Sequence, residues 1–245
     1  MDRDLDVAGT VHASLLPPPY DDDRLLIDLK YLPLLPVGGD YVHIHREDPL
    51  RPSITVFDVS GHGIASALVA GRVPSAVSAF MDSGDPPEDM IGRLNRFVHN
   101  SFADMGIFVT LFASQLDLRA GTLCYCGAGH PPTLLRRADN EIVRLASQHL
   151  PIGVVPAIFI DEPAEQVDIR SGDTVWYYTD GLYELRNPAG RMLGMKGLTE
   201  RIATLDLSDI RLGLARRSLE MIIADQGPAD DDMTRVGEPQ RQLPF

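Results

Sequence analysis

The stretch SITVFDVSGHGIASAL, residues 53–68, joins an apolar run to an alanine-rich segment through an acid and nearby glycines. Residues 53–59 are rich in β-branched and aromatic side chains, which predicts a strand, and the residues after Gly63 have helical spacing. Asp58 interrupts this strand, where a carboxylate is unfavourable unless it is paired or bound to a cation. The glycines let the backbone approach a ligand closely. We therefore expect Asp58 to face a metal ion.

The elements on either side of this stretch predict an α+β fold in which mostly antiparallel sheets are covered by helices. Their order is strands, two helices, many strands, two helices and one strand, which differs from the alternation of a parallel sheet. We expect strands at residues 24–32, 41–46, 53–59, 107–117, 122–129, 133–138, 141–146 and 173–180, and a last one near Met233. Helices are expected at residues 3–16, 64–81 with a kink at Pro74, 86–102, 196–205 and 210–226. No polar linker divides the chain, which favours one domain.

The composition excludes several classes of partner. The chain has 245 residues, 44% of them hydrophobic, and a formal net charge of −13, which disfavours nucleic acid or an anionic membrane as the main partner. The start lacks the pattern of a signal peptide, and no run of about 18 apolar residues exists that could span a membrane. Cys124 and Cys126 are interpreted as buried thiols in a reducing compartment. We expect a cytoplasmic protein that attracts cations.

Further acids stand at the ends of apolar segments. Asp40 follows two glycines, Asp180 precedes Gly181 at the end of a strand, and an acidic triplet at residues 230–232 precedes the last strand. Mg²⁺ and Mn²⁺ prefer carboxylate and carbonyl oxygens, and the chain has no array of histidines and cysteines that would indicate zinc. The acids together predict a site for hard divalent ions.

Several motifs occur in the order seen in one family. The chain resembles the bacterial metal-dependent serine/threonine phosphatases of the type 2C superfamily, in the branch with the stage II sporulation phosphatase and the RsbU-like regulators of sigma factors. The resemblance covers about residues 5–236 and implies a sandwich of two antiparallel sheets flanked by helices. It divides the chain into a connector helix with a proline-rich stop at residues 1–19, a phosphatase domain at 20–236 and a flexible tail at 237–245. The motifs are PVGGDY, DVSGHGIASAL, FVTLF, GAGHPP, LPIGV, YTDGLYELRNPAG and DDMT.

The resemblance also implies a site with two divalent ions, Mn²⁺ or Mg²⁺. The ligands it implies are the carboxylates of Asp58 (bridging), Asp40, Asp180 and Asp231 and the backbone carbonyl of Val59, with Asp232 and Gly181 as possible additions. A hydroxide that bridges the ions would attack the phosphoserine of a regulatory protein, by analogy an anti-sigma-factor antagonist. His62 would donate a proton to the leaving serine oxygen, or would only support the glycine loop.

Some interpretations stay open in the sequence. A catalytically degenerate phosphatase fold that binds a signalling partner, or a hydrolase of small phosphoesters, would share these motifs. His43 replaces an acid that is common in the family, and it is interpreted, with His45, as an exposed strand histidine rather than a ligand of a third metal; His130 is interpreted as structural. The helix at residues 3–16 carries an apolar stripe that must pack on the core, on a second copy or on an upstream regulator. The stripe consists of Leu5, Ala8, Val11 and Leu15.

Overall fold

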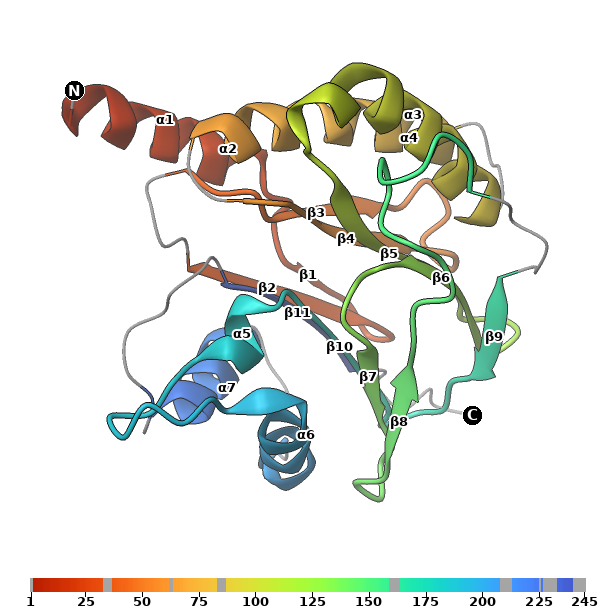
Figure 1. Cartoon of the computed structure of the whole chain (residues 1–245). Helices are drawn as coiled ribbons and strands as arrows, with labels where there is room; N and C mark the ends of the chain where they lie inside the picture. The colour runs from red at the N-terminus through yellow and green to blue at the C-terminus, as the bar shows by residue number, and fades with distance from the viewer. Residues whose placement is uncertain are drawn as a thin grey trace. The chain divides into compact units, whose positions relative to one another are not determined.

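The computed structural model describes residues 2–32, 37–61, 64–82, 87–158, 164–207, 213–224, 226 and 233–239. These residues form two antiparallel sheets with helices, which confirms the predicted α+β class (Figure 1). The chain divides into two compact units. The first holds the described residues of Met1–Pro17, Leu35–Pro131 and Ala146–Ile169, and the second those of Pro18–Leu34, Pro132–Leu145 and Arg170–Phe245. Because their segments alternate along the chain, the units are not successive domains.

The first unit contains a sheet of strand order β3-β4-β5-β6-β9. Most of its strands follow the predicted apolar runs, but β9 was not expected, because three of its four residues, EQVD, are polar. It joins the sheet by antiparallel backbone pairing with β6. The strands are β3 (Tyr41–His45), β4 (Ser53–Val59), β5 (Val109–Asp117), β6 (Thr122–Ala128) and β9 (Glu165–Asp168).

Helices cover one face of this sheet, where Figure 1 shows α3 and α4 lying across it. Their apolar side chains form a core cluster with the strands, and the amphipathic α4 buries Ile91, Leu94 and Val98 in it. The helices of this unit are α1 (Asp2–Leu15), α2 (Ile64–Ala70), α3 (Val73–Asp82), α4 (Pro87–Phe102) and the 3-10 turn η1 (Ala103–Met105).

The segment after the glycines corrects one prediction. The sequence predicts a single helix over residues 64–81 with a kink at Pro74, whereas the structure has two helices separated at Gly71 and Arg72. Arg72 N donates to the carbonyl of Val69 at 2.9 Å, which closes the turn between them. Pro74 is the second residue of α3, where a missing backbone N–H breaks no helical hydrogen bond. The proline therefore begins a helix rather than bending one.

The second unit contains a sheet of strand order β1-β2-β11-β10-β7-β8. Its central strand β10, TVWYY, is buried along its whole length, and residues 237–239, which the sequence places in a tail, pair with it as part of β11. The strands are β1 (Tyr20–Asp21), β2 (Leu26–Leu32), β7 (Thr133–Arg136), β8 (Ile142–Leu145), β10 (Thr174–Tyr178) and β11 (Met233–Pro239).

In the described part of this unit the helices are α5 (Gly181–Glu184), α6 (Gly194–Thr204) and α7 (Leu214–Ile223). The start of α7 has no capping side chain of its own, and Asp28 of β2 takes that role. Its Oδ2 accepts hydrogen bonds from the backbone N–H of Gly213 at 2.8 Å and of Ala215 at 2.9 Å. The capping bonds satisfy donors that a helix start would otherwise leave unpaired. None of the described helices is long and apolar enough to cross a membrane.

Candidate metal centre

Gly39 approaches the end of β4 so closely that no side chain fits between them. A Cβ atom on Gly39 would lie 2.7 Å from the carbonyl oxygen of Val59 and 3.2 Å from Oδ1 of Asp58. The backbone N–H of Val59 also donates to the carbonyl of Gly39 at 3.3 Å. A carboxylate oxygen and a carbonyl oxygen therefore face the same small space. Both are hard oxygen donors of the kind that Mg²⁺ and Mn²⁺ prefer, so these residues fit a divalent ion.

Asp40 lies next to this space, directly before β3. Tyr41 pairs with Phe57 across the antiparallel strands β3 and β4. The residue before Tyr41, Asp40, is therefore the neighbour across the strands of the residue after Phe57, Asp58. Asp40 is 1% exposed, and Asp58 is half-buried, whereas the other residues of β4 are buried. Two neighbouring carboxylates with this burial repel each other, and a bound cation relieves that repulsion. The first unit thus brings three of the predicted ligands together.

Asp180 belongs to the second unit, where it follows the buried strand β10 as the sequence predicts. Its backbone carbonyl accepts hydrogen bonds from Tyr183 and Glu184, both at 3.0 Å, and so starts helix α5. Its carboxylate does not cap that helix, and Gly181 beside it is buried. The short helix thus begins on an acid whose carboxylate makes no capping hydrogen bond to it.

Other predicted site residues lie outside the described part of the chain, namely His62, Asp231 and Asp232. Among the residues that the structure describes, no group of three or more histidine, cysteine, aspartate or glutamate side chains is placed to hold a metal ion. The complete ligand set therefore stays a prediction. The structure describes the positions of Asp40, Asp58 and Val59 in the first unit.

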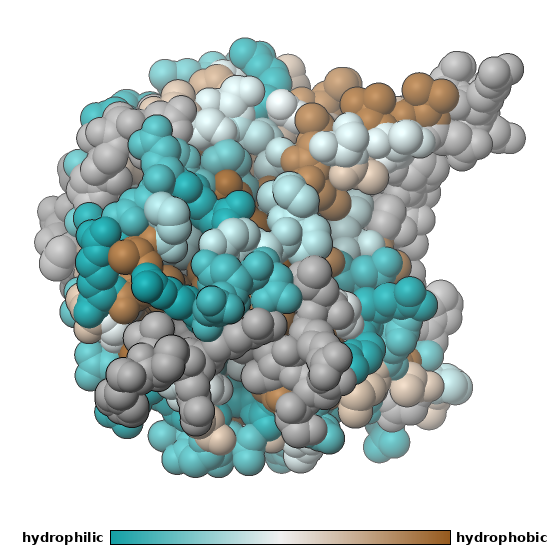
Figure 2. All heavy atoms as spheres, turned by 180° about the vertical axis from the view of Figure 1, so that it is seen from behind, coloured by the Kyte–Doolittle hydropathy of each residue, from teal (hydrophilic) through white to brown (hydrophobic). Residues whose placement is uncertain are grey.

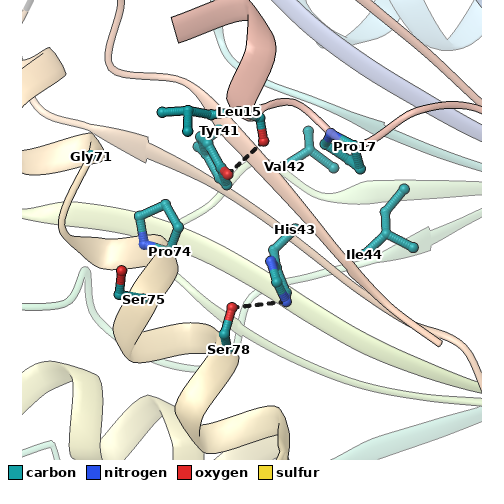
Figure 3. A pocket seen from close by; sticks show the side chains of 10 residues that line it. All are labelled: Leu15, Pro17, Tyr41, Val42, His43, Ile44, Gly71, Pro74, Ser75 and Ser78. Carbon is teal, nitrogen blue, oxygen red and sulfur yellow. Dashed lines mark hydrogen bonds between the residues drawn. The ribbon is translucent and has the colours of Figure 1, made fainter. Parts of the chain in front are cut away.

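His43 corrects another interpretation. The sequence interprets His43 and His45 as exposed, but both are half-buried on β3. The His43 ring points from β3 toward α3, where Nε2 lies 3.3 Å from Oγ of Ser78 (Figure 3). It lines a pocket of about 380 Å³, together with Leu15, Pro17, Tyr41, Val42, Ile44, Gly71, Pro74, Ser75 and Ser78. The partner is a hydroxyl on a helix, which indicates a packing role.

His130 is buried, in agreement with its interpretation as structural. Its Nδ1 lies 3.0 Å from Oγ1 of Thr110, and its carbonyl accepts a hydrogen bond from Ser147 at 2.7 Å. Thr110 pairs with Asp58 across β4 and β5, so this histidine supports the strand residue opposite the predicted bridging ligand. Sequence reasoning missed Thr110 and the close approach of Gly39, because neither residue type indicates a metal site by itself.

The cysteines are unpaired thiols. Cys126 is buried and Cys124 half-buried, both on β6. Burial is the main cause that raises the pKa of the Cys126 thiol to about 12. A thiol with this pKa is protonated at neutral pH, so Cys126 is a packing residue rather than a nucleophile.

Solved structures show the fold class of this chain. The SiaA-PP2C domain of Pseudomonas aeruginosa has a TM-score of 0.78 and 19% identity, covering 98% of this chain and 97% of that one. The PP2C phosphatase domain of SpoIIE from Bacillus subtilis, solved with a fragment of its regulatory domain, has a TM-score of 0.75 and 19% identity, covering 90% of this chain and 64% of that one. The catalytic domain of the serine/threonine phosphatase PstP, solved with two manganese ions, has a TM-score of 0.61 and 16% identity, covering 89% and 99%. The fold is that of the type 2C phosphatase domain.

Sequence comparisons then show the family. The phosphoserine phosphatase RsbU of Bacillus subtilis is 27% identical over 191 residues, which cover 76% of this chain and 55% of RsbU. RsbP of the same organism is 26% identical over 189 residues, which cover 74% of this chain and 45% of RsbP. The chain thus spans about half the length of these relatives. The family model of stage II sporulation protein E (SpoIIE) matches residues 49–237, and the chain belongs to that family.

Proposed function

We propose that the chain is a metal-dependent protein serine/threonine phosphatase that hydrolyses phosphoserine on a regulatory protein. The observation that carries this proposal is the convergence of Asp58 Oδ1 and the Val59 carbonyl on the space beside Gly39, with buried Asp40 adjacent. Two relatives that match most of the chain, RsbU and RsbP, are phosphoserine phosphatases. These oxygen atoms are of the kind that would bind the metal ions this activity needs, which supports the proposal.

In this proposal two divalent ions, Mn²⁺ or Mg²⁺, are held by oxygen ligands, and the related fold of PstP binds two manganese ions. When bound, such a pair lowers the pKa of a shared water and stabilises charge on the phosphoryl oxygens. Asp58 would be the bridging ligand, and the Val59 backbone carbonyl would be a further ligand from β4. The remaining ligands would be Asp40, Asp180 and Asp231, with Asp232 and Gly181 as possible additions.

We propose His62 as the proton donor to the leaving serine oxygen. A serine alkoxide is a poor leaving group and needs a proton, whereas an aryl oxide leaves without one. His62→Ala is therefore expected to slow phosphoserine hydrolysis by about 10²-fold and to change aryl phosphate hydrolysis much less. Steady-state kinetics on both substrates measure this difference. Equal losses on the two substrates would assign His62 to the support of the glycine loop instead.

The proposed substrate is a phosphorylated anti-sigma-factor antagonist, which rests on the resemblance to RsbU. The second candidate function is a catalytically degenerate phosphatase fold that binds a signalling partner. The acids at Asp40, Asp58 and Asp180 favour an active enzyme, because a degenerate copy has no need to keep carboxylates at strand ends.

The test is hydrolysis of phosphorylated antagonist proteins from the same genome, and of an aryl phosphate, in Mn²⁺ and in EDTA. An active phosphatase releases phosphate from a phosphoserine protein in Mn²⁺ and stops in EDTA. Binding of the phosphoprotein without phosphate release supports the degenerate module, and hydrolysis of the aryl phosphate alone supports a hydrolase of small phosphoesters.

For regulation, we propose self-association or an upstream regulator at the exposed face of α1. Val7, Val11 and Leu15 are 58%, 55% and 46% exposed and are spaced four residues apart, so they share one face. Apolar side chains follow the described part of this helix in Figure 2. The C-terminal end of α1 is held to β3, because Tyr41 donates its hydroxyl to the Leu15 carbonyl at 2.7 Å. The predicted stripe therefore leaves Val11 and Leu15 uncovered by this chain.

Val11→Asp is expected to weaken self-association by at least tenfold, because it places a charge in an apolar contact. Analytical ultracentrifugation of the wild type and the variant measures this, and Met221→Asp, at a 55% exposed position on α7, is the matched control. A wild type that stays monomeric at every concentration excludes self-association and leaves the upstream regulator.

A further inference from the structure

A second group of exposed apolar side chains lies in the first unit, away from α1. Met105, Phe108, Leu150 and Val154 are 70%, 37%, 58% and 51% exposed. They come from two segments, residues 105–109 and 150–154, that the backbone brings together. Val109 and Ile152 exchange two backbone hydrogen bonds, of 2.9 Å and 2.8 Å. We refer to these four side chains as the apolar rim.

The apolar rim is joined directly to the strand end that carries Asp58. Ser60, two residues after Asp58, donates its N–H to the carbonyl of Phe108 at 2.9 Å. The N–H of Phe108 donates in return to Oγ of Ser60 at 3.0 Å. Val59, the predicted carbonyl ligand, pairs with Val109 across β4 and β5. The strand end with Asp58 and the segment with Phe108 are therefore neighbours in the fold.

Buried polar contacts hold the rim in one conformation. Asn95 of α4 is fully buried, where Oδ1 accepts the N–H of Gly153 at 2.8 Å and Nδ2 donates to the carbonyl of Val155 at 3.0 Å. Gly153 has a φ of 94°, and a Cβ there would lie 2.6 Å from a methyl group of Val98. The loop that exposes Leu150 and Val154 is thus fixed to α4, and a preformed contact surface loses little conformational entropy on binding.

The charge distribution favours a phosphorylated protein as the occupant. The chain has a net charge of −13, yet neither residues 105–109 nor residues 150–158 contain a charged side chain. A phosphoprotein brings further negative charge to the metal site. The exposed Asp104 before Met105 is the acid at the edge of these segments. A surface with so few charges lets the partner approach with little like-charge repulsion at the contact.

We propose that the apolar rim is a docking surface for the phosphoprotein substrate, which contacts it with an apolar patch next to its phosphoserine. The inference rests on the proposed phosphatase function. Metal ions and their ligands recognise the phosphoryl group, which every phosphoserine shares, so selection among proteins needs contacts outside the site. A few residues supply most of the binding energy in such contacts, and burial of exposed apolar side chains is favourable by itself.

The test is the double variant Leu150→Ser/Val154→Ser, assayed in Mn²⁺ on a phosphorylated antagonist protein, on a short phosphoserine peptide from it and on an aryl phosphate. The expected result is a loss of at least tenfold in kcat/KM on the phosphoprotein, mainly through KM, because two apolar contacts are removed. Hydrolysis of the peptide and of the aryl phosphate stays unchanged. Met221→Ser is the matched control, since Met221 is comparably exposed on α7.

Unchanged kinetics on the phosphoprotein overturn the docking inference, and so does an equal loss on all three substrates, which indicates a damaged metal site. A change in oligomeric state by light scattering, with KM unaltered, makes the rim an interface between copies and also overturns it. A wild type that hydrolyses none of the substrates contradicts the proposed phosphatase function. This outcome differs from the outcomes that overturn docking, in which the wild type is active.

Discussion

Asp58→Ala is expected to abolish metal-dependent hydrolysis and to leave the fold intact. Asp58 is the proposed bridging ligand, so its removal takes oxygen from both ions, and a lost stabilisation of several kcal/mol corresponds to at least about 10³-fold in rate. Stability should hold or rise, because Asp58 and the buried Asp40 are neighbouring carboxylates whose repulsion disappears. Asp180→Ala is expected to have the same effect on hydrolysis.

The measurements are initial rates over a Mn²⁺ titration and thermal unfolding in EDTA. Asp23→Ala is the matched control, because Asp23 is an exposed acid outside the site, and its rates should equal those of the wild type. Turnover at the wild-type level by Asp58→Ala in added Mn²⁺ would contradict the site. A fall in unfolding temperature with the metal absent would instead make Asp58 a structural carboxylate.

The strand end at Asp58 was predictable because local signals agree there. An apolar strand, an acid and glycines stand in one short stretch, and together they indicate a site that none of them indicates alone. The same reasoning predicted Asp180 at the end of β10, a strand that is buried on both faces and therefore reads as a continuous apolar run. Apolar periodicity indicates where strands end, and acids at these ends are unusual enough to indicate chemistry.

Elements without periodicity could not be predicted. The strand β9 has polar residues and joins the sheet through backbone hydrogen bonds, which any sequence can make. The strand β1 has two residues and the helix α5 has four, too few for a spacing to emerge. The break between α2 and α3 was assigned to Pro74 rather than to Gly71, because a proline in a first turn looks the same in sequence as a proline in a kink.

The acids of the metal centre could be predicted from the sequence, but the positions of their oxygen atoms relative to Gly39 could not. The sequence shows glycines before Asp40, yet it does not show that Gly39 reaches the Val59 carbonyl 20 positions later. That contact depends on the pairing of β3 with β4, which forms only in the folded chain. The role of Gly39 therefore follows from the structure, and it leads to a test of its own.

Gly39→Ala is expected to reduce metal-dependent hydrolysis by about 10²-fold, although it removes no ligand. The new Cβ would lie 2.7 Å from the carbonyl oxygen of Val59, a distance at which backbone must shift, and 3.2 Å from Oδ1 of Asp58. Both proposed ligand oxygens are displaced together, and a misplacement of about 1 Å in a catalytic group costs about 10²-fold in rate. The expected cause is a weaker affinity for Mn²⁺, so high metal concentrations should restore part of the activity.

Gly71→Ala is the matched control, since a Cβ at Gly71 makes ordinary contacts of 3.5 Å and 3.6 Å with backbone carbonyl oxygens. Calorimetric titration with Mn²⁺ and rates at several metal concentrations distinguish the two variants. Gly39→Ala with wild-type Mn²⁺ affinity would show that the space beside Val59 and Asp58 holds no ion. Loss of Mn²⁺ affinity in Gly39→Ala alone, with both variants folded by circular dichroism, would locate the ion beside Gly39, because only there does the added methyl group compete with it for the same volume.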